Sequence, residues 1–195
     1  MPVKRPKDPI ARAILKHRLM TSAELLVLAG SYVQIRRRAE AGMITPLGSG
    51  LYASPSLDPF VAAVFAAAKY YPNAVISGLT SLAIYELSDE YIERVDVDIP
   101  RGTSLANRLL KVHRVTQRKM EGRCELKFHG QMIRIYDLER TLCESYRLDP
   151  AGPLFFKALK RYMQRKRINA DRIRKYDALL KTRVLMHIQQ ELADG

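Results

Sequence analysis

The sequence predicts an α+β protein in which a small helical unit with a hairpin precedes a larger α+β unit. Three observations support this: closely spaced helix caps before residue 45, short alternating segments between residues 95 and 136, and helical periodicity from about residue 152. The 195 residues are 47% hydrophobic, enough for one or two compact domains. We expect two domains, residues 1–56 and 57–195, the second ending in a basic helical tail.

The composition argues against several classes of protein. The first ten residues are charged and lack the apolar core of a secretory signal. The longest apolar run, "PFVAAVFAAA", is ten residues, about half of a membrane span. Cys124 and Cys143 form neither a metal-ligand cluster nor a disulfide framework. We therefore expect a cytoplasmic protein with no membrane contact, no metal and no cofactor.

The net charge of +13 is unevenly distributed along the chain. Residues 1–55 contain 9 Lys and Arg against 3 Asp and Glu, residues 56–151 contain 13 against 13, and residues 152–195 contain 11 against 4. The two terminal segments thus contain the positive excess, which favours a polyanionic partner. A solvated basic surface is the alternative.

Three short helices are predicted before residue 42. Asp8, followed by proline, is a helix cap with Pro at the first helical position. Thr21 and Glu24 form a capping box for a second helix, which ends at Gly30. Ser31 then caps the third helix. Two short helices joined by a glycine-containing turn are the signature of a helix-turn-helix.

The third helix has two predicted faces. At about 100° per residue, Tyr32, Ile35 and Ala39 fall within one arc, which we expect to be buried. Arg36 lies close to Tyr32, at the edge of the core. Gln34, Arg37 and Arg38 are expected to point outward, where Gln and Arg can read base edges or bind phosphates.

A hairpin is predicted directly after this helix. Gly42 ends the helix, and "MIT" and "LYA" flank the turn "PLGSG". The tip, near Gly48 and Ser49, can approach a phosphate backbone, so the segment as a whole predicts a winged helix-turn-helix. The expected DNA contacts are Thr21, Ser31, Tyr32, Gln34, Arg36, Arg37, Arg38, Gly48 and Ser49.

The second unit begins with a helix capped by Asp58 and continues with a helix for which Ser77 is the expected cap. "VDVDIP" alternates strictly and predicts a half-buried strand with Asp96 and Asp98 on its solvent face. "LLKVHRV", "RCELKF" and "MIRIY" predict further strands. A helix capped by Asp137 follows, and the remainder is helical.

The chain resembles the AbiEi-type antitoxins of type IV toxin–antitoxin systems from about residue 8 to about residue 182. The resemblance depends on the order of four segments: the hairpin ending "GLYA", then "VISGLTSLAIYEL", "VDVDIPRG" and "IRIYDLERTL". It implies a bacterial phage-defence or mobile-element protein whose winged helix binds inverted repeats in its own promoter and represses the operon. It also implies antitoxicity against a nucleotidyltransferase toxin, without a stable complex between the two. Inverted repeats are compatible with a dimer on DNA.

Two enzymatic interpretations were weighed against this one. Asp96, Asp98 and Asp137 resemble the Mg²⁺ ligands of a nucleotidyltransferase, but the Gly-Gly or Gly-Ser turn of that fold is not present upstream. Glu125 and Lys127, with Asp96, resemble a metal-dependent nuclease motif that is common by chance. We expect no catalytic residues and no enzymatic activity. A winged-helix regulator with a ligand-sensing domain is a third interpretation.

The C-terminal tail contains a second basic candidate surface on a predicted amphipathic helix. Nucleic-acid contact and a solvated face are about equally favoured for it. Its residues are Lys157, Lys160, Arg161, Arg165 and Lys166.

Overall fold

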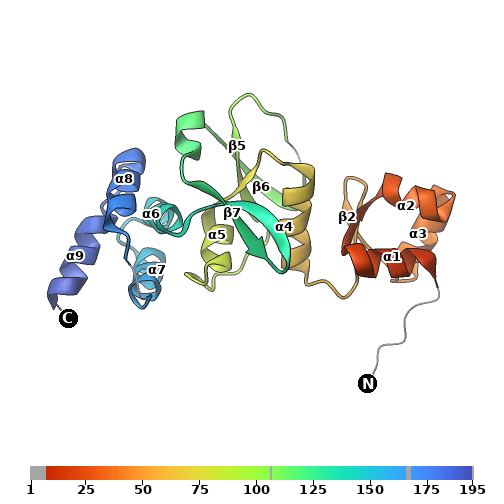
Figure 1. The fold of residues 1–195 in the computed structure, drawn as a ribbon, viewed down its shortest axis with the longest axis horizontal. Coiled ribbons are helices and arrows are strands. Elements are labelled where there is room, and N and C mark those ends of the chain that lie inside the picture. Colours follow the sequence, from red (N-terminus) through yellow and green to blue (C-terminus); the bar gives the residue numbers. More distant parts are fainter. Residues whose placement is uncertain (1–7, 106, 166–167, 195) are drawn as a thin grey trace, which may run out of the picture.

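The computed structural model describes residues 8–105, 107–165 and 168–194, and has a mixed α and β fold. The chain is elongated, with an N-terminal unit at one end, a central sheet, and the C-terminal helices at the other end (Figure 1). The N-terminal unit contains α1 (Pro9–His17), β1 (Leu19–Thr21), α2 (Ser22–Ala29), α3 (Tyr32–Glu40), β2 (Thr45–Gly48) and β3 (Leu51–Ala53). The central elements are α4 (Pro59–Tyr70), β4 (Val75–Ile76), α5 (Gly78–Ile84), β5 (Val95–Pro100), β6 (Leu110–Val115), the 3₁₀ helix η1 (Gln117–Met120), β7 (Arg123–Phe128) and β8 (Gln131–Tyr136). The C-terminal helices are α6 (Leu138–Leu148), α7 (Pro153–Met163), α8 (Ala170–Leu180) and α9 (Val184–Asp194).

The predicted caps of the N-terminal helices are confirmed. The Asp8 carboxylate accepts hydrogen bonds from the backbone amides of the first turn of α1, at 2.9 and 3.0 Å. Thr21 and Glu24 form the reciprocal capping box of α2. The Ser31 hydroxyl accepts from the amide of Gln34 in α3. These bonds join residues at most three positions apart, so the local sequence was sufficient to predict them.

The N-terminal sheet has one strand more than the predicted hairpin. Its order is β1-β3-β2, and all pairs are antiparallel. Only three residues long, β1 lies between two helices and has no alternating pattern to reveal it. Beneath the sheet, Ile10, Ile14, Leu25, Ile35 and Ile44 form the core of the unit.

The central sheet has five strands in the order β6-β5-β4-β8-β7. The pairs β5–β6 and β4–β8 are parallel, whereas β4–β5 and β7–β8 are antiparallel. One face packs on α4 through Val64, Val97 and Ile135. The opposite face is covered by α5, which packs on β5, and by Arg140 of α6, whose guanidinium lies over the Tyr136 ring, so that the sheet lies between helices (Figure 1).

This second layer contradicts the expectation that Asp96 and Asp98 face solvent. Their side chains point away from α4, as the alternation predicts, but they are only 4% and 5% exposed. The start of α5 lies against Asp96, and a Cβ added at Gly78 would be 3.0 Å from the Cγ of this residue. The strand is therefore buried on both faces, although its sequence alternates.

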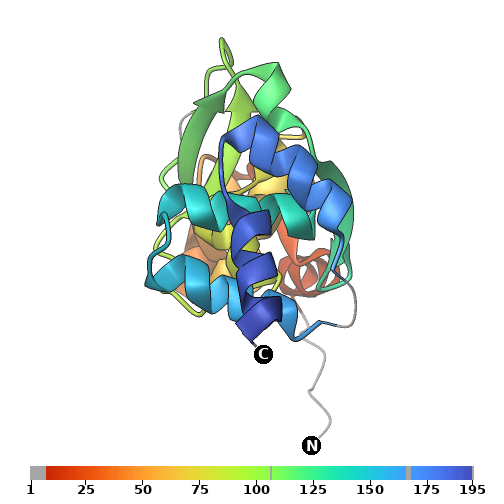
Figure 2. The same cartoon turned by 90° about the vertical axis from the view of Figure 1, so that its left-hand side faces the viewer.

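The helices α7, α8 and α9 form a separate layer over α6. Leu142 of α6, Phe155 and Tyr162 of α7, Ile173 of α8 and Ile188 of α9 share one apolar cluster. Figure 2 shows these helices stacked at the end of the molecule opposite the N-terminal unit. Among the described residues, no helix is both long enough and apolar enough to span a bilayer.

The N-terminal unit is packed firmly onto the central one. Leu47 and Leu51 of the hairpin share an apolar cluster with Phe65 of α4. Lys69 of α4 also forms an ion pair with Glu24 of α2 at 3.0 Å. The core thus crosses the expected boundary near residue 56, and separating the two parts there would expose apolar side chains on both.

Candidate nucleic-acid interface

The outward face of α3 consists of Tyr32, Val33, Arg36 and Arg37. Arg37 is exposed, as predicted. Tyr32 was expected in the buried arc but is 62% exposed. The buried face of α3 is centred on Ile35 and extends toward Arg38. Tyr32, in the first turn, lies outside this face and is exposed.

Arg38 and Gln34 do not point outward, contrary to the prediction. The Arg38 guanidinium donates from Nε to Asp8 Oδ2 at 2.9 Å and from Nη1 to Gln34 Oε1 at 2.8 Å. Burial alone would raise the pKa of Asp8, but the Ala11 amide and Arg38 hold it below its ordinary value. Arg38 thus connects α3 to the first turn of α1, and it is not free to read DNA.

Arg36 was expected at the edge of the core but lies exposed on the surface of α3. Its side chain is 82% exposed and pairs with Glu40, one turn further along α3, at 2.8 Å. An exposed pair of this kind contributes little to stability, so a phosphate or a base can compete for Arg36 at small cost. Within the part of the chain that the structure describes, Arg36 and Arg37 are the exposed cations of this face, and Arg36 is paired with Glu40.

Of the remaining predicted contacts, Ser31 caps α3, and Thr21, Gly48 and Ser49 gather at the start of α2. Strand pairing places Thr21 opposite Leu51, so the start of α2 lies beside the turn of the hairpin. The Ser22 amide donates to the Gly50 carbonyl at 2.7 Å and holds the two together. Ser49 is exposed at the tip, with a positive φ of 52°. An exposed turn of this kind is suited to a phosphate group, whereas the Ser22 and Glu24 amides at the start of α2 already have acceptors within the unit.

One residue at this place was missed by the sequence reasoning. Arg108, from the connection between β5 and β6, lies against the hairpin turn, and a Cβ added at Gly48 would be 3.1 Å from its Nε. A signal was present in the sequence, because residues 99–120 contain six Lys and Arg and no Asp or Glu. This positive run was hidden because the charges of residues 56–151, counted together, sum to zero.

The predicted basic surface on α7 is largely occupied by internal contacts. Lys157 and Arg161 both pair with Asp89, Arg161 at 3.0 Å. Arg165 donates to the backbone carbonyl of Tyr85. These cations attach α7 to the segment after α5, so their charge is partly neutralised within the chain. Lys166 lies outside the described residues.

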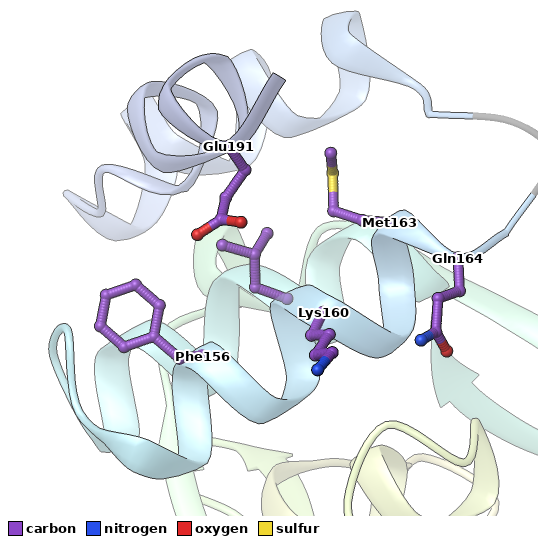
Figure 3. Close-up of a pocket in the computed structure, with 6 residues that line it drawn as sticks. Phe156, Lys160, Met163, Gln164 and Glu191 are labelled. Atoms are coloured by element: carbon purple, nitrogen blue, oxygen red, sulfur yellow. The ribbon is translucent and has the colours of Figure 1, made fainter. Parts of the chain in front are cut away.

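Lys160 instead borders a groove between α7 and α9 of about 580 Å³ (Figure 3). Figure 3 shows Phe156 at one end of the groove, Met163 toward the other, and Glu191 reaching over from α9. The lining residues are Phe156, Leu159, Lys160, Met163, Gln164 and Glu191. This lining is mainly apolar, with one cation and one anion, and includes no nucleophile paired with a base.

The two buried aspartates are each bonded to a neighbouring side chain. Asp96 Oδ1 is 2.8 Å from His113 Nε2 on β6, and Asp98 Oδ2 accepts a hydrogen bond from the Tyr136 hydroxyl at 2.8 Å. Asp137 is directed elsewhere and caps α6. No group of three or more His, Cys, Asp and Glu side chains suited to a metal ion occurs among the described residues. The structure does not bring the three aspartates together.

Burial and bonding shift the pKa values of these groups in defined directions. Burial raises the pKa of Asp98, and the hydrogen bond from Tyr136 opposes this. The hydrogen bond to Asp96 raises the pKa of His113, against the effect of partial burial. Burial pushes the pKa of Glu144 upward, but Arg140 and Arg147 outweigh it and hold the pKa below its ordinary value. For each of these three groups, burial and a neighbouring side chain shift the pKa in opposite directions.

The second enzymatic motif is not assembled either. Glu125 and Lys127 lie on β7, at the opposite edge of the sheet from β6. β4 and β8 separate β7 from the strand that contains Asp96.

Comparisons with known proteins provide a fold and no family. No family model matches the chain, and no curated protein matches it. Among solved structures, the chain is similar to the crystal structure of the RV2827C protein from Mycobacterium tuberculosis, with a TM-score of 0.60 and 15% sequence identity. That similarity covers 87% of this chain and 70% of the other. At this level of identity the comparison shows a shared fold.

Proposed function

We propose that the protein is a DNA-binding transcriptional repressor that is also the antitoxin of a bacterial type IV toxin–antitoxin operon. The observation that carries the DNA-binding part is the exposed face of α3, where Arg36 and Arg37 are free of the core. In this proposal α1, α2 and α3 with the three-stranded sheet form a winged helix-turn-helix, and α3 enters the major groove.

The side chains on this face suit direct reading of bases. Arginine pairs in bidentate fashion with guanine, and the exposed Val33 suits contact with the methyl group of thymine. At the other end of α2, the exposed hairpin turn around Ser49 contacts a phosphate in this proposal, and Thr21 lies beside it with its hydroxyl bonded to the Glu24 amide. Each half-site of the operator would then combine a guanine-containing core with flanking phosphate contacts.

The antitoxin part of the proposal rests on the sequence resemblance. In this proposal the central and C-terminal elements antagonise a nucleotidyltransferase toxin as a functional partner, without a stable complex and in the cytoplasm. A non-catalytic role is consistent with the internal pairing of Asp96, Asp98 and Glu144.

Binding of the protein to duplex DNA from immediately upstream of its own gene tests the first part. We expect Arg37→Ala to weaken binding by about 1–3 kcal/mol and to relax the base preference at one position. Arg174→Ala is the matched control, because Arg174 is equally cationic but lies exposed on α8 at the far end of the molecule. Equal losses in both variants would show that the contact depends only on overall charge.

Co-expression with the neighbouring toxin gene tests the second part. Arg37→Ala should lose repression of a promoter reporter and keep protection of the cells, because the two roles lie in different units. A wild-type protein that gives no protection would refute the antitoxin role and leave the DNA-binding role intact.

A further inference from the structure

A row of cations lies along β6 and the segments before and after it at the edge of the central sheet, with Lys111 and Arg114 on opposite faces of the strand. Between Asp98 and Glu121 there is no acidic residue, and every Lys and Arg in this interval is exposed. We name these side chains the β6 basic edge: Arg101, Arg108, Lys111, Arg114, Arg118 and Lys119. Among the described residues, only Lys111 of this set has a carboxylate within 4.0 Å, that of Asp96 at 3.7 Å. The set differs in this respect from the cations of α7.

Protection of an exposed strand does not explain this composition. Charged side chains on an edge strand prevent pairing with other chains, and either sign serves that purpose. The opposite edge strand of the same sheet, β7, carries Arg123, Glu125 and Lys127, all exposed and of mixed sign. The exclusively positive charge along β6 therefore indicates a negatively charged ligand.

The β6 basic edge is continuous with the hairpin of the N-terminal unit. Arg108 contacts Gly48 at the hairpin turn, and Figure 1 shows that the hairpin lies at the end of its unit facing the central sheet. The apolar cluster of Leu47 and Leu51 with Phe65 fixes that unit on α4. At the other end, the carbonyl of Lys119 accepts a hydrogen bond from Arg140 at 3.2 Å, which anchors η1. The whole row thus has a fixed position relative to α3.

We propose that the β6 basic edge binds the phosphate backbone of duplex DNA that flanks the half-site read by α3. This inference rests on the proposed function and extends the interface beyond the N-terminal unit. Six strand residues span about 20 Å, more than half of one ~34 Å turn of the duplex. The row lacks the exposed large apolar side chains that would anchor it in a membrane, because Val112 and Val115 are partly covered.

Binding of the full chain to two duplexes with the same half-site tests the proposal. One duplex of about 14 base pairs contains the half-site alone, and one of roughly 30 base pairs adds flanking sequence on both sides. We expect wild-type protein to bind the longer duplex more tightly and with a steeper dependence on salt. For Arg114→Ala/Arg118→Ala, the salt slope on the longer duplex should fall by about 1.8, since each neutralised phosphate contributes roughly 0.9. Affinity for that duplex at about 100 mM salt should fall at least tenfold.

The control variant is Arg123→Ala/Lys127→Ala, which removes two exposed cations from β7 at the other edge of the same sheet. It should behave as wild type on both duplexes, and all variants should show the wild-type melting temperature. The half-site duplex should be bound equally by every variant. Specific binding of both duplexes with the same slope for wild type and Arg114→Ala/Arg118→Ala would overturn the inference and spare the proposed function. Failure of wild-type protein to bind either duplex would overturn both.

Discussion

Replacing Tyr136 by Phe should destabilise the protein by about 2 kcal/mol at pH 7. The substitution keeps the buried ring, including its contact with the Arg140 guanidinium at 4.4 Å, and removes only the hydroxyl. That hydroxyl donates to Asp98 Oδ2 at 2.8 Å, where both residues are buried. A hydrogen bond to a charged group contributes roughly 1.5–3 kcal/mol, and a carboxylate that loses its donor cannot recover it from water here.

The effect should depend on pH in a defined direction. Burial raises the pKa of Asp98 above its unfolded value of about 3.9, so the folded protein binds this proton more tightly than the unfolded chain. The contribution of Asp98 to stability is therefore largest at acid pH and declines as pH rises through the folded pKa. Tyr136→Phe raises this pKa further, so its cost should be smaller at pH 4 than at pH 7.

Asp98→Asn separates the hydrogen bond from the charge. The amide oxygen can still accept from Tyr136, and a buried charge is removed, so we expect a change within about 1 kcal/mol. In this background Tyr136→Phe should cost only about 1 kcal/mol, as expected for a neutral acceptor. The four proteins of this cycle can be compared by urea unfolding followed by circular dichroism. Tyr91→Phe is the matched control, because Tyr91 is 86% exposed. A cost below about 0.5 kcal/mol for Tyr136→Phe at pH 7, or the same cost in both backgrounds, would refute the reasoning.

Three further predictions concern the helix α3 and the His113–Asp96 pair. Arg36→Ala should weaken binding to operator DNA and leave the urea midpoint unchanged, because this side chain is exposed and its partner Glu40 is too; a lowered midpoint would contradict its exposed position. Arg38→Ala should lower stability by about 1 kcal/mol by removing the link from α3 to Asp8, while sequence preference in DNA binding stays that of wild type; an altered base preference would place Arg38 in the groove. His113→Gln should change the pH dependence of the melting temperature. In wild type the His113–Asp96 pair stabilises the fold below about pH 6.5, and this stabilisation is lost as pH rises through the raised pKa of folded His113, whereas the variant should lack this dependence. Parallel pH profiles of the melting temperature for the two proteins would rule out this role of the pair.

Local chemistry predicted most of the secondary structure. The caps at Asp8, Thr21, Ser31 and Asp137 were predicted because each bond joins a side chain to an amide within three residues. The strand β5 was predicted from its strict alternation, and β6, β7 and β8 were predicted as further strands. The strands β1 and β4 have three and two residues and are defined by their partners, so no pattern in the chain could reveal them. Ser77 was predicted to cap α5, and this prediction is wrong: Ser77 occupies the N-cap position, but its hydroxyl makes no capping bond.

The candidate interface was predicted only in part, because orientation around a helix axis depends on what the helix packs against. The sequence by itself placed Arg36, Arg37 and Arg38 on one short helix, and the position of α1 decided that Arg38 would bond to Asp8 while Arg36 stayed free.

The same distinction applies to the central sheet. The sequence determined that Asp96 and Asp98 share a face of β5, since successive side chains of a strand alternate. Only the tertiary structure decided that this face is buried, because α5 packs against it. It alone also brought Arg108 to Gly48, sixty positions away in the chain. A pattern of residues reports the geometry within its own element, whereas burial and long-range proximity depend on the packing between elements that no single segment encodes.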